Sequence, residues 1–198
     1  MKAWVIDTER DLRLRALGRH DAEIVSQIAA RAFGTAETGE CVRRMLRIYL
    51  ASGCADIPLE RQEHTLLPVT YYILVQGEAS RERGIGLTGL YRRLWEEEQE
   101  GNYWLGWFAV DPDFQGQGMG ERLLRATMAL CTAKGGRRLS IETAPELQSA
   151  RRLYRRLGFT EAPAIPDYWK EGSDLILFHR RLDGNEFHDL LPPKGISL

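Results

Sequence analysis

The sequence predicts a three-layer α/β domain, with a mixed, mostly antiparallel central sheet of about seven strands and helices on both faces. The 198 residues suit one domain with a substantial core. Three strand-like segments follow one another between residues 69 and 110, joined by polar turns, which favours antiparallel pairing. Helical and strand-like segments then alternate, which adds helices against the sheet. We expect this domain over residues 1–182 and a C-terminal tail over residues 183–198.

The first third of the chain predicts one strand and two helices. Residues 12–17 alternate apolar and basic side chains, as a first or edge strand does. Asp21 is a suitable N-cap for a helix over residues 22–33, where Ile24 and Ile28 recur at helical spacing. A second helix is expected within residues 39–52, and a loop over the polar residues 52–67.

The rest of the chain predicts the main sheet and two further helices. β-branched and aromatic residues are dense in its strand-like segments. Each helix carries one apolar face and ends near a glycine, Gly135 or Gly158, as C-caps often do. The expected strands are residues 69–76, 84–92, 103–110, 137–143 and 173–182, and the expected helices are residues 118–136 and 147–159.

Composition narrows the function classes. The hydrophobic fraction is 43%, the charged fraction 28% and the formal net charge −1, so nothing in the overall charge favours nucleic acid or a membrane surface. No apolar run reaches the length of a membrane span. The three cysteines have no CxxC spacing and indicate reduced thiols, which favours the cytoplasm. The four histidines have no metal-ligand spacing, so no metal site is expected.

Three alternate glycines, Gly116, Gly118 and Gly120, stand between the strand expected at 103–110 and the next helix. Glycines let the backbone approach a ligand closely, and the N–H groups at a helix start attract anions. The P-loop pattern fails because no Lys-Ser or Lys-Thr pair follows. The dinucleotide pattern fails because Glu121 stands where its last glycine should be. The glycine spacing alone is equally compatible with a glycine-rich turn that binds no ligand.

Two longer motifs decide between these readings. The string VDPDFQGQGMG, residues 110–120, resembles at every patterned position the acetyl-CoA-binding segment of the GNAT N-acetyltransferases. The string ARRLYRRLGF, residues 150–159, resembles the second motif of the same family, in the right order and at the right separation. The resemblance is close over about residues 103–159.

The resemblance implies a site for acetyl-CoA as co-substrate. In this family the fourth and fifth strands splay apart, and the pantetheine arm lies in the gap. The backbone of Phe108, Ala109 and Val110 would hold the arm and the thioester. Ser149 or Gln148 would replace a cofactor-binding asparagine of the family, since Leu147 stands at its position. The pyrophosphate would lie on the amides of Gln115, Gly116, Gln117, Gly118, Met119, Gly120 and Glu121.

The resemblance also implies direct acetyl transfer to an amine. Tyr154 matches the general acid of the family, although its place on an apolar helical stripe also suits a core residue. A strand amide, that of Val110, is the candidate for the oxyanion contact. The expected fourth strand contains no acid, so the base is either Glu100 before it or Glu142 on the fifth strand, and either could be an ordinary surface or capping acid.

We therefore predict an N-acetyltransferase acting on a primary amine of a small molecule or a peptide. The alternative is a catalytically weak acyl-CoA-binding sensor or partner protein that keeps the fold. The arginines around Tyr154 fit a solvated helix face better than a nucleic-acid site, and one of Arg122, Arg125 or Arg155 is a candidate for the 3′-phosphate. Strand alternation puts Trp104 and Trp107 on opposite faces. A homodimer is a further partnership that the sequence leaves open.

Overall fold

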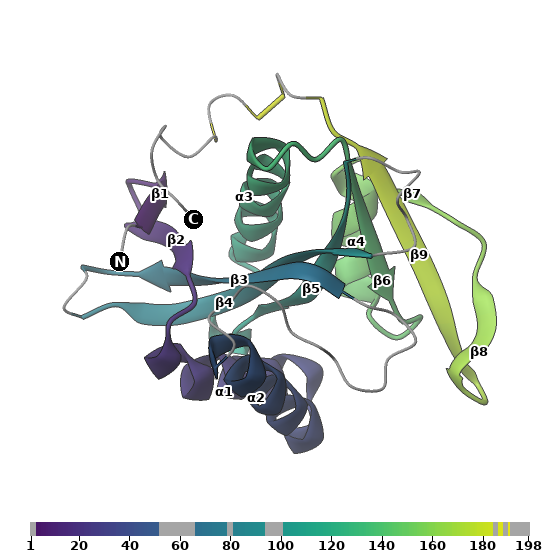
Figure 1. Cartoon of the computed structure of the whole chain (residues 1–198), viewed down its shortest axis with the longest axis horizontal. Coiled ribbons are helices and arrows are strands. Elements are labelled where there is room, and N and C mark those ends of the chain that lie inside the picture. Colours follow the sequence, from purple (N-terminus) through teal and green to yellow (C-terminus); the bar gives the residue numbers. More distant parts are fainter. Residues whose placement is uncertain are drawn as a thin grey trace.

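A twisted sheet runs through the middle of the molecule, with helices above and below it (Figure 1). The computed structural model describes residues 3–51, 66–78, 81–93, 101–183, 186–187 and 190. Within them the sheet has nine strands in the order β1-β2-β3-β4-β5-β6-β9-β7, and β8 also pairs with β9. All pairs are antiparallel except β5 with β6. The predicted class, a mixed and mostly antiparallel sheet between helices, is confirmed.

The strands follow the sequence pattern closely in the centre of the sheet. Those expected from the sequence are β2 (Leu12–Ala16), β3 (Leu66–Gln76), β4 (Arg83–Arg93), β5 (Asn102–Val110), β6 (Arg138–Thr143) and β9 (Ser173–Arg181). Three short strands were not expected: β1 (Ala3–Asp7), β7 (Thr160–Glu161) and β8 (Ile165–Lys170). These three lie at the margins of the sheet, where few residues are buried and the apolar pattern is weak.

Two helices cover each face. The helices α1 (Ala22–Phe33) and α2 (Ala36–Ala51) lie on one face, and α3 (Met119–Ala133) and α4 (Gln148–Arg156) on the other (Figure 1). The two faces have separate cores, one centred on α3 and one on α1. The expected tail contributes to the first core, since Phe187 is 1% exposed there. No helix in the described residues is both long and apolar enough to span a bilayer.

The start of α1 is fixed by a buried ion pair rather than by a side-chain cap. Asp21 occupies the N-cap position, as predicted, but its carboxylate does not bond to the helix amides. It accepts from Arg15 Nη1 at 2.6 Å and from the Gly18 amide at 2.6 Å. Burial opposes ionisation of Asp21, yet these bonds hold its pKa below the usual range. Arg15 also pairs with Glu82, so α1 is tied to β2 and to the β3–β4 turn.

Candidate active site

The strands β5 and β6 separate halfway along their length. They pair in parallel from Asn102 with Arg138 to Leu105 with Ile141, and the pairing then stops. Each strand keeps its other neighbour beyond that point: β5 pairs with β4 as far as Val110, and β6 with β9 as far as Thr143. The two edges that face each other across the gap therefore have no ladder partner there. This is the predicted splay of the fourth and fifth strands of the family pattern.

A bulge in β5 accompanies the separation. The register with β4 shifts between Leu87 and Gly89, and Trp107 has a φ of +33°, which a non-glycine residue rarely adopts. The extra residue reverses the alternation of the strand. Trp107 and Trp104 consequently lie on the same face, in the core of α1, and the prediction that they lie on opposite faces was wrong.

The direction of the Val110 amide follows from the same ladder. The Asp111 amide donates to the Ile85 carbonyl at 3.0 Å. Successive N–H groups of a strand point to opposite sides. The Val110 amide therefore points away from β4 and into the gap.

The glycine loop leads directly from β5 into α3. Gly116 and Gly118 have φ values of +74° and +80°, and α3 begins at Met119. Within the described part of the chain, the amides of residues 116–121 have no hydrogen-bond acceptor. The loop thus presents a run of free N–H groups at the positive end of a helix, which is a site for an anion.

Side chains hold this loop from within. Gln115 Nε2 donates to the Val110 carbonyl at 2.9 Å, and Gln117 Nε2 donates to the Asp113 carbonyl at 2.9 Å. Asp111 Oδ1 accepts from the Asp113 amide at 2.9 Å. The two glutamine side chains are therefore part of the frame of the loop, and its amides are left for a ligand.

Arginines hold the loop from outside. Arg31 on α1 donates to Asp111 Oδ2 at 2.9 Å and to Asp113 Oδ1 at 2.7 Å. Arg83 reaches the other oxygen of Asp113 at 3.1 Å and stacks over the Phe114 ring at 4.6 Å. The loop on one face is thereby connected to the helix on the other.

Tyr154 lies on α4 among aromatic rings. It is 4% exposed, and its ring lies 5.4 Å from Phe178, 6.0 Å from Phe159 and 6.4 Å from Phe108, centroid to centroid. Burial raises the pKa of its phenol, so the group stays protonated at neutral pH. The ring is a core residue, as one of the two expectations had it, but it also lines the cavity described below.

Glu142 lies on the opposite side of the gap. Its carboxylate is ion-paired with Arg93, whose guanidinium lies 3.6 Å from the centroid of the Trp104 ring. Glu142 is 19% exposed and lines the same cavity as Tyr154. The other expected base, Glu100, lies outside the described residues.

One cavity joins these groups. Its volume is about 1420 Å³, and it opens through the β5–β6 gap onto both faces of the sheet. Of the predicted loop residues, Gln117 does not line it, and neither does Gln148, the alternative to Ser149. The predicted site residues on its wall are Phe108, Ala109, Val110, Gln115, Gly116, Gly118, Met119, Gly120, Glu121, Glu142, Ser149 and Tyr154.

The arginines near the loop have distinct roles. Arg122 pairs with Asp7, Arg125 with Glu121, and Arg155 with Glu161, so each candidate for the 3′-phosphate is already engaged. Arg152 on α4 lines the cavity and forms no ion pair among the described residues. The sequence interpretation missed it because all four arginines of that helix fit a solvated face.

Comparisons with known proteins agree with this geometry. A model of the acetyltransferase (GNAT) family matches residues 52–159, more than half of the chain. A Bacillus subtilis protein assigned as a ribosomal protein bS18 alanine N-acetyltransferase is 33% identical over 70 residues, 35% of this chain and 46% of that protein. The B. subtilis spermine/spermidine N(1)-acetyltransferase is 31% identical over 77 residues, 38% of this chain and 51% of that protein. The chain thus spans about half the length of the curated relatives it matches.

Solved structures share the fold over most of the chain. A Desulfovibrio desulfuricans protein assigned to the GNAT acetyltransferases superposes with a TM-score of 0.68 at 22% identity, covering 86% of this chain and 98% of that chain. At this identity the likeness concerns the fold alone. The family model, however, covers all of β5, the glycine loop and α4, where the separated strands and the free amides lie. The chain therefore belongs to the GNAT family of acetyltransferases.

Proposed function

We propose that the chain transfers an acetyl group from acetyl-CoA directly to a primary amine. The observation that carries this proposal is the single cavity that passes through the β5–β6 gap. On one face it meets the free amides of residues 116–121 and the Tyr154 side chain, and on the other it meets Glu142. A bound acyl-CoA and an amine can thus approach each other from opposite faces of the sheet.

The residues present fit the co-substrate. Acetyl-CoA supplies an electrophilic thioester carbonyl and a thiol leaving group. The amides of residues 116–121 would bind its pyrophosphate, with roughly 0.3–1 kcal/mol per charge from the helix terminus in addition to the hydrogen bonds. The open edge of β5 at Phe108 and Val110, on either side of Ala109, would pair with the amides of the arm, as a strand would. Arg152 would bind a phosphate and Ser149 would donate to the same ligand.

Two groups of the chain would act on the thioester, one on its carbonyl oxygen and one on its sulfur. The Val110 amide, which points into the gap, would donate to the carbonyl oxygen as negative charge develops there. The Tyr154 hydroxyl would donate to the departing sulfur. Its raised pKa means that it gives up the proton only as charge accumulates on that sulfur.

Glu142 is the general base that we propose, acting on the amine directly or through one water molecule. It lies across the gap from Tyr154, so proton removal and proton delivery would take place on opposite sides of the reacting carbon. The ion pair with Arg93 fixes the position of its carboxylate.

The acceptor is a primary amine of a small molecule or of a peptide. The names of the two Bacillus subtilis relatives described above give one acceptor of each kind: an alanine of a ribosomal protein for the first and a polyamine for the second. We also propose a cytoplasmic location, because Cys41 and Cys131 are free thiols.

Turnover separates this proposal from a binding-only protein. The purified chain is mixed with acetyl-CoA and a panel of primary amines, and CoA release and acetylated amine are both quantified. We expect one acetylated amine for each CoA released. Tight binding of acetyl-CoA without any product across the panel would contradict the proposal and favour a sensor or partner role.

A further inference from the structure

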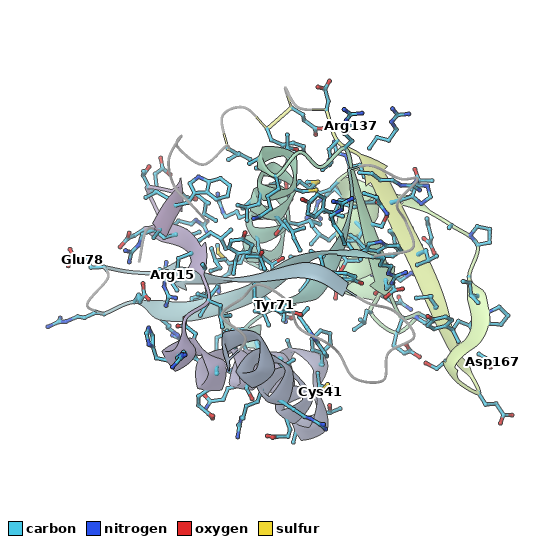
Figure 2. All side chains as sticks on the ribbon, in the orientation of Figure 1. Arg15, Cys41, Tyr71, Glu78, Arg137 and Asp167 are labelled. Atoms are coloured by element: carbon cyan, nitrogen blue, oxygen red, sulfur yellow. The ribbon has the colours of Figure 1, made fainter. Side chains whose placement is uncertain are left out.

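Four aromatic side chains from four elements converge on the part of the cavity that lies on the α1 face. They are Phe33 of α1, Tyr71 of β3, Tyr91 of β4 and Trp107 of β5. Phe33 and Trp107 meet edge to face, with ring centroids 5.9 Å apart and planes at 77°. Tyr71 lies between the sheet and the helices of this face (Figure 2). We call this part of the cavity the aromatic chamber.

Two glycines make room for the tyrosine rings. A Cβ atom on Gly89 would lie 2.6 Å from Cε1 of Tyr71, and one on Gly106 would lie 3.2 Å from Cδ1 of Tyr91. Any other residue at Gly89 would displace the ring. The rings therefore lie directly on the strand backbone, and this places them at the wall of the chamber.

The β5 bulge supplies the fourth wall. With regular alternation Trp107 would lie on the α3 face, away from the chamber. Its positive φ costs about 1 kcal/mol or more and is sustained by the surrounding packing. The bulge that accompanies the strand separation thus also places an indole on the wall of the chamber.

The described part of the chamber has few charged side chains that could bind a charged group of the acceptor. Among the described residues that line it, Glu142 is the one carboxylate, and Arg93 already pairs with it. The other charged residue there is a cation, Arg44 on α2. No described carboxylate of the chamber is left to bind a second ammonium group.

We propose that the acceptor carries its primary amine on an aromatic or similarly large apolar body. This rests on the proposed acetyl transfer. The apolar body would fill the chamber between Phe33 and Trp107, and the amine would point toward the gap and Glu142. Burial of a ring against rings is favourable, whereas a second ammonium group buried among these rings would lose its hydration.

The test compares three amines with acetyl-CoA held at saturation. Phenethylamine has one amine on a ring, ethanolamine has one amine without a ring, and spermidine has several charges. We expect kcat/KM for phenethylamine to exceed that for each of the others by at least about tenfold. Equal or higher kcat/KM for spermidine would overturn the inference while leaving acetyl transfer intact. Absence of product from all three amines and from the wider panel would overturn acetyl transfer itself.

Two variants test whether the preference for an aromatic amine depends on the aromatic chamber. Phe33→Ala removes one wall of the chamber and should raise KM for phenethylamine by about tenfold, with the Kd of acetyl-CoA unchanged. Tyr168→Ala is the matched control, because Tyr168 on β8 is 42% exposed and lies outside the cavity. An unchanged KM in Phe33→Ala would overturn the inference, as would a rise of the same size in Tyr168→Ala.

Discussion

Replacement of Tyr154 by phenylalanine removes one hydroxyl group from the wall of the cavity. The ring contacts with Phe108, Phe159 and Phe178 remain, and so does the volume of the core. Among the described residues the hydroxyl has no hydrogen-bond partner, so its removal leaves no protein group unsatisfied. We expect the free energy of unfolding to change by less than about 1 kcal/mol.

The expected kinetic loss is much larger. General acid catalysis contributes about 10²- to 10⁴-fold in rate, most when the pKa of the acid lies near the working pH. Burial raises the pKa of Tyr154 above its usual range, and therefore further from that optimum. We expect a loss near the lower limit, about 10²-fold in kcat, or about 2.7 kcal/mol at 1.36 kcal/mol per tenfold.

The assay separates the two effects. CoA release gives kcat, calorimetry gives the Kd of acetyl-CoA, and thermal unfolding gives the stability of each variant. Tyr168→Phe, at an exposed tyrosine outside the cavity, is the matched control. A loss below threefold in Tyr154→Phe would refute the role as acid. An equal loss in Kd would mean that the hydroxyl serves binding instead.

Three further predictions test separate parts of the site, and a fourth tests the core around α3. Glu142→Gln should lower kcat about 10²-fold at neutral pH, and less as the pH approaches the pKa of the amine, measured as a pH–rate profile. Gly118→Ala should weaken acetyl-CoA binding about tenfold, measured by calorimetry. Gly118 has a φ of +80°, and a Cβ added there would have no atom within 4 Å, so the substitution is opposed by backbone strain and not by a steric contact. Arg31→Ala and Asp113→Ala should each raise the Kd of acetyl-CoA roughly two- to fivefold, and the double variant by less than the product of the two, since they share one ion pair while Arg31 also pairs with Asp111 and Asp113 with Arg83. Burial raises the pKa of the Cys131 thiol to about 12, so stability should be complete below about pH 8.5 and fall by up to about 1.4 kcal/mol per pH unit toward pH 12. Denaturant unfolding should show a shallower fall in Cys131→Ala.

Each of these has an outcome that contradicts it. A pH-independent loss in Glu142→Gln would point to a structural role for the carboxylate. Full affinity in Gly118→Ala would mean that the loop accepts another conformation. Additive losses in the Arg31 and Asp113 variants would show that the two side chains act separately. An alkaline stability curve unchanged in Cys131→Ala would place the titration elsewhere.

The features of the candidate site that are local in the chain are the ones that the sequence indicates directly. The glycine loop needs positive φ values at Gly116 and Gly118, and glycine spacing reports such a need directly. The gap between β5 and β6 came from the family resemblance, since no local pattern indicates where a ladder ends. The tyrosine motif likewise led to Tyr154, although its aromatic surroundings come from distant strands.

Long-range features escaped the sequence for physical reasons. The face of Trp107 was assigned by alternation, and one extra residue in β5 reversed it. Arg152 could be singled out only after the neighbouring arginines were seen to be ion-paired. Phe187 lies in a segment of low apolar content, yet it packs into the core against Arg180. Each case depends on contacts between residues far apart in sequence.

The central claim is that an acyl-CoA and an amine meet through the β5–β6 gap. A crystal structure with a bisubstrate analogue, CoA joined through an acetyl linker to phenethylamine, tests it most directly. We predict the pyrophosphate on the amides of residues 116–121, the linker carbonyl within hydrogen-bond distance of the Val110 amide, and the phenyl ring between Phe33 and Trp107. An analogue bound outside the gap, with those amides still free, would contradict the account.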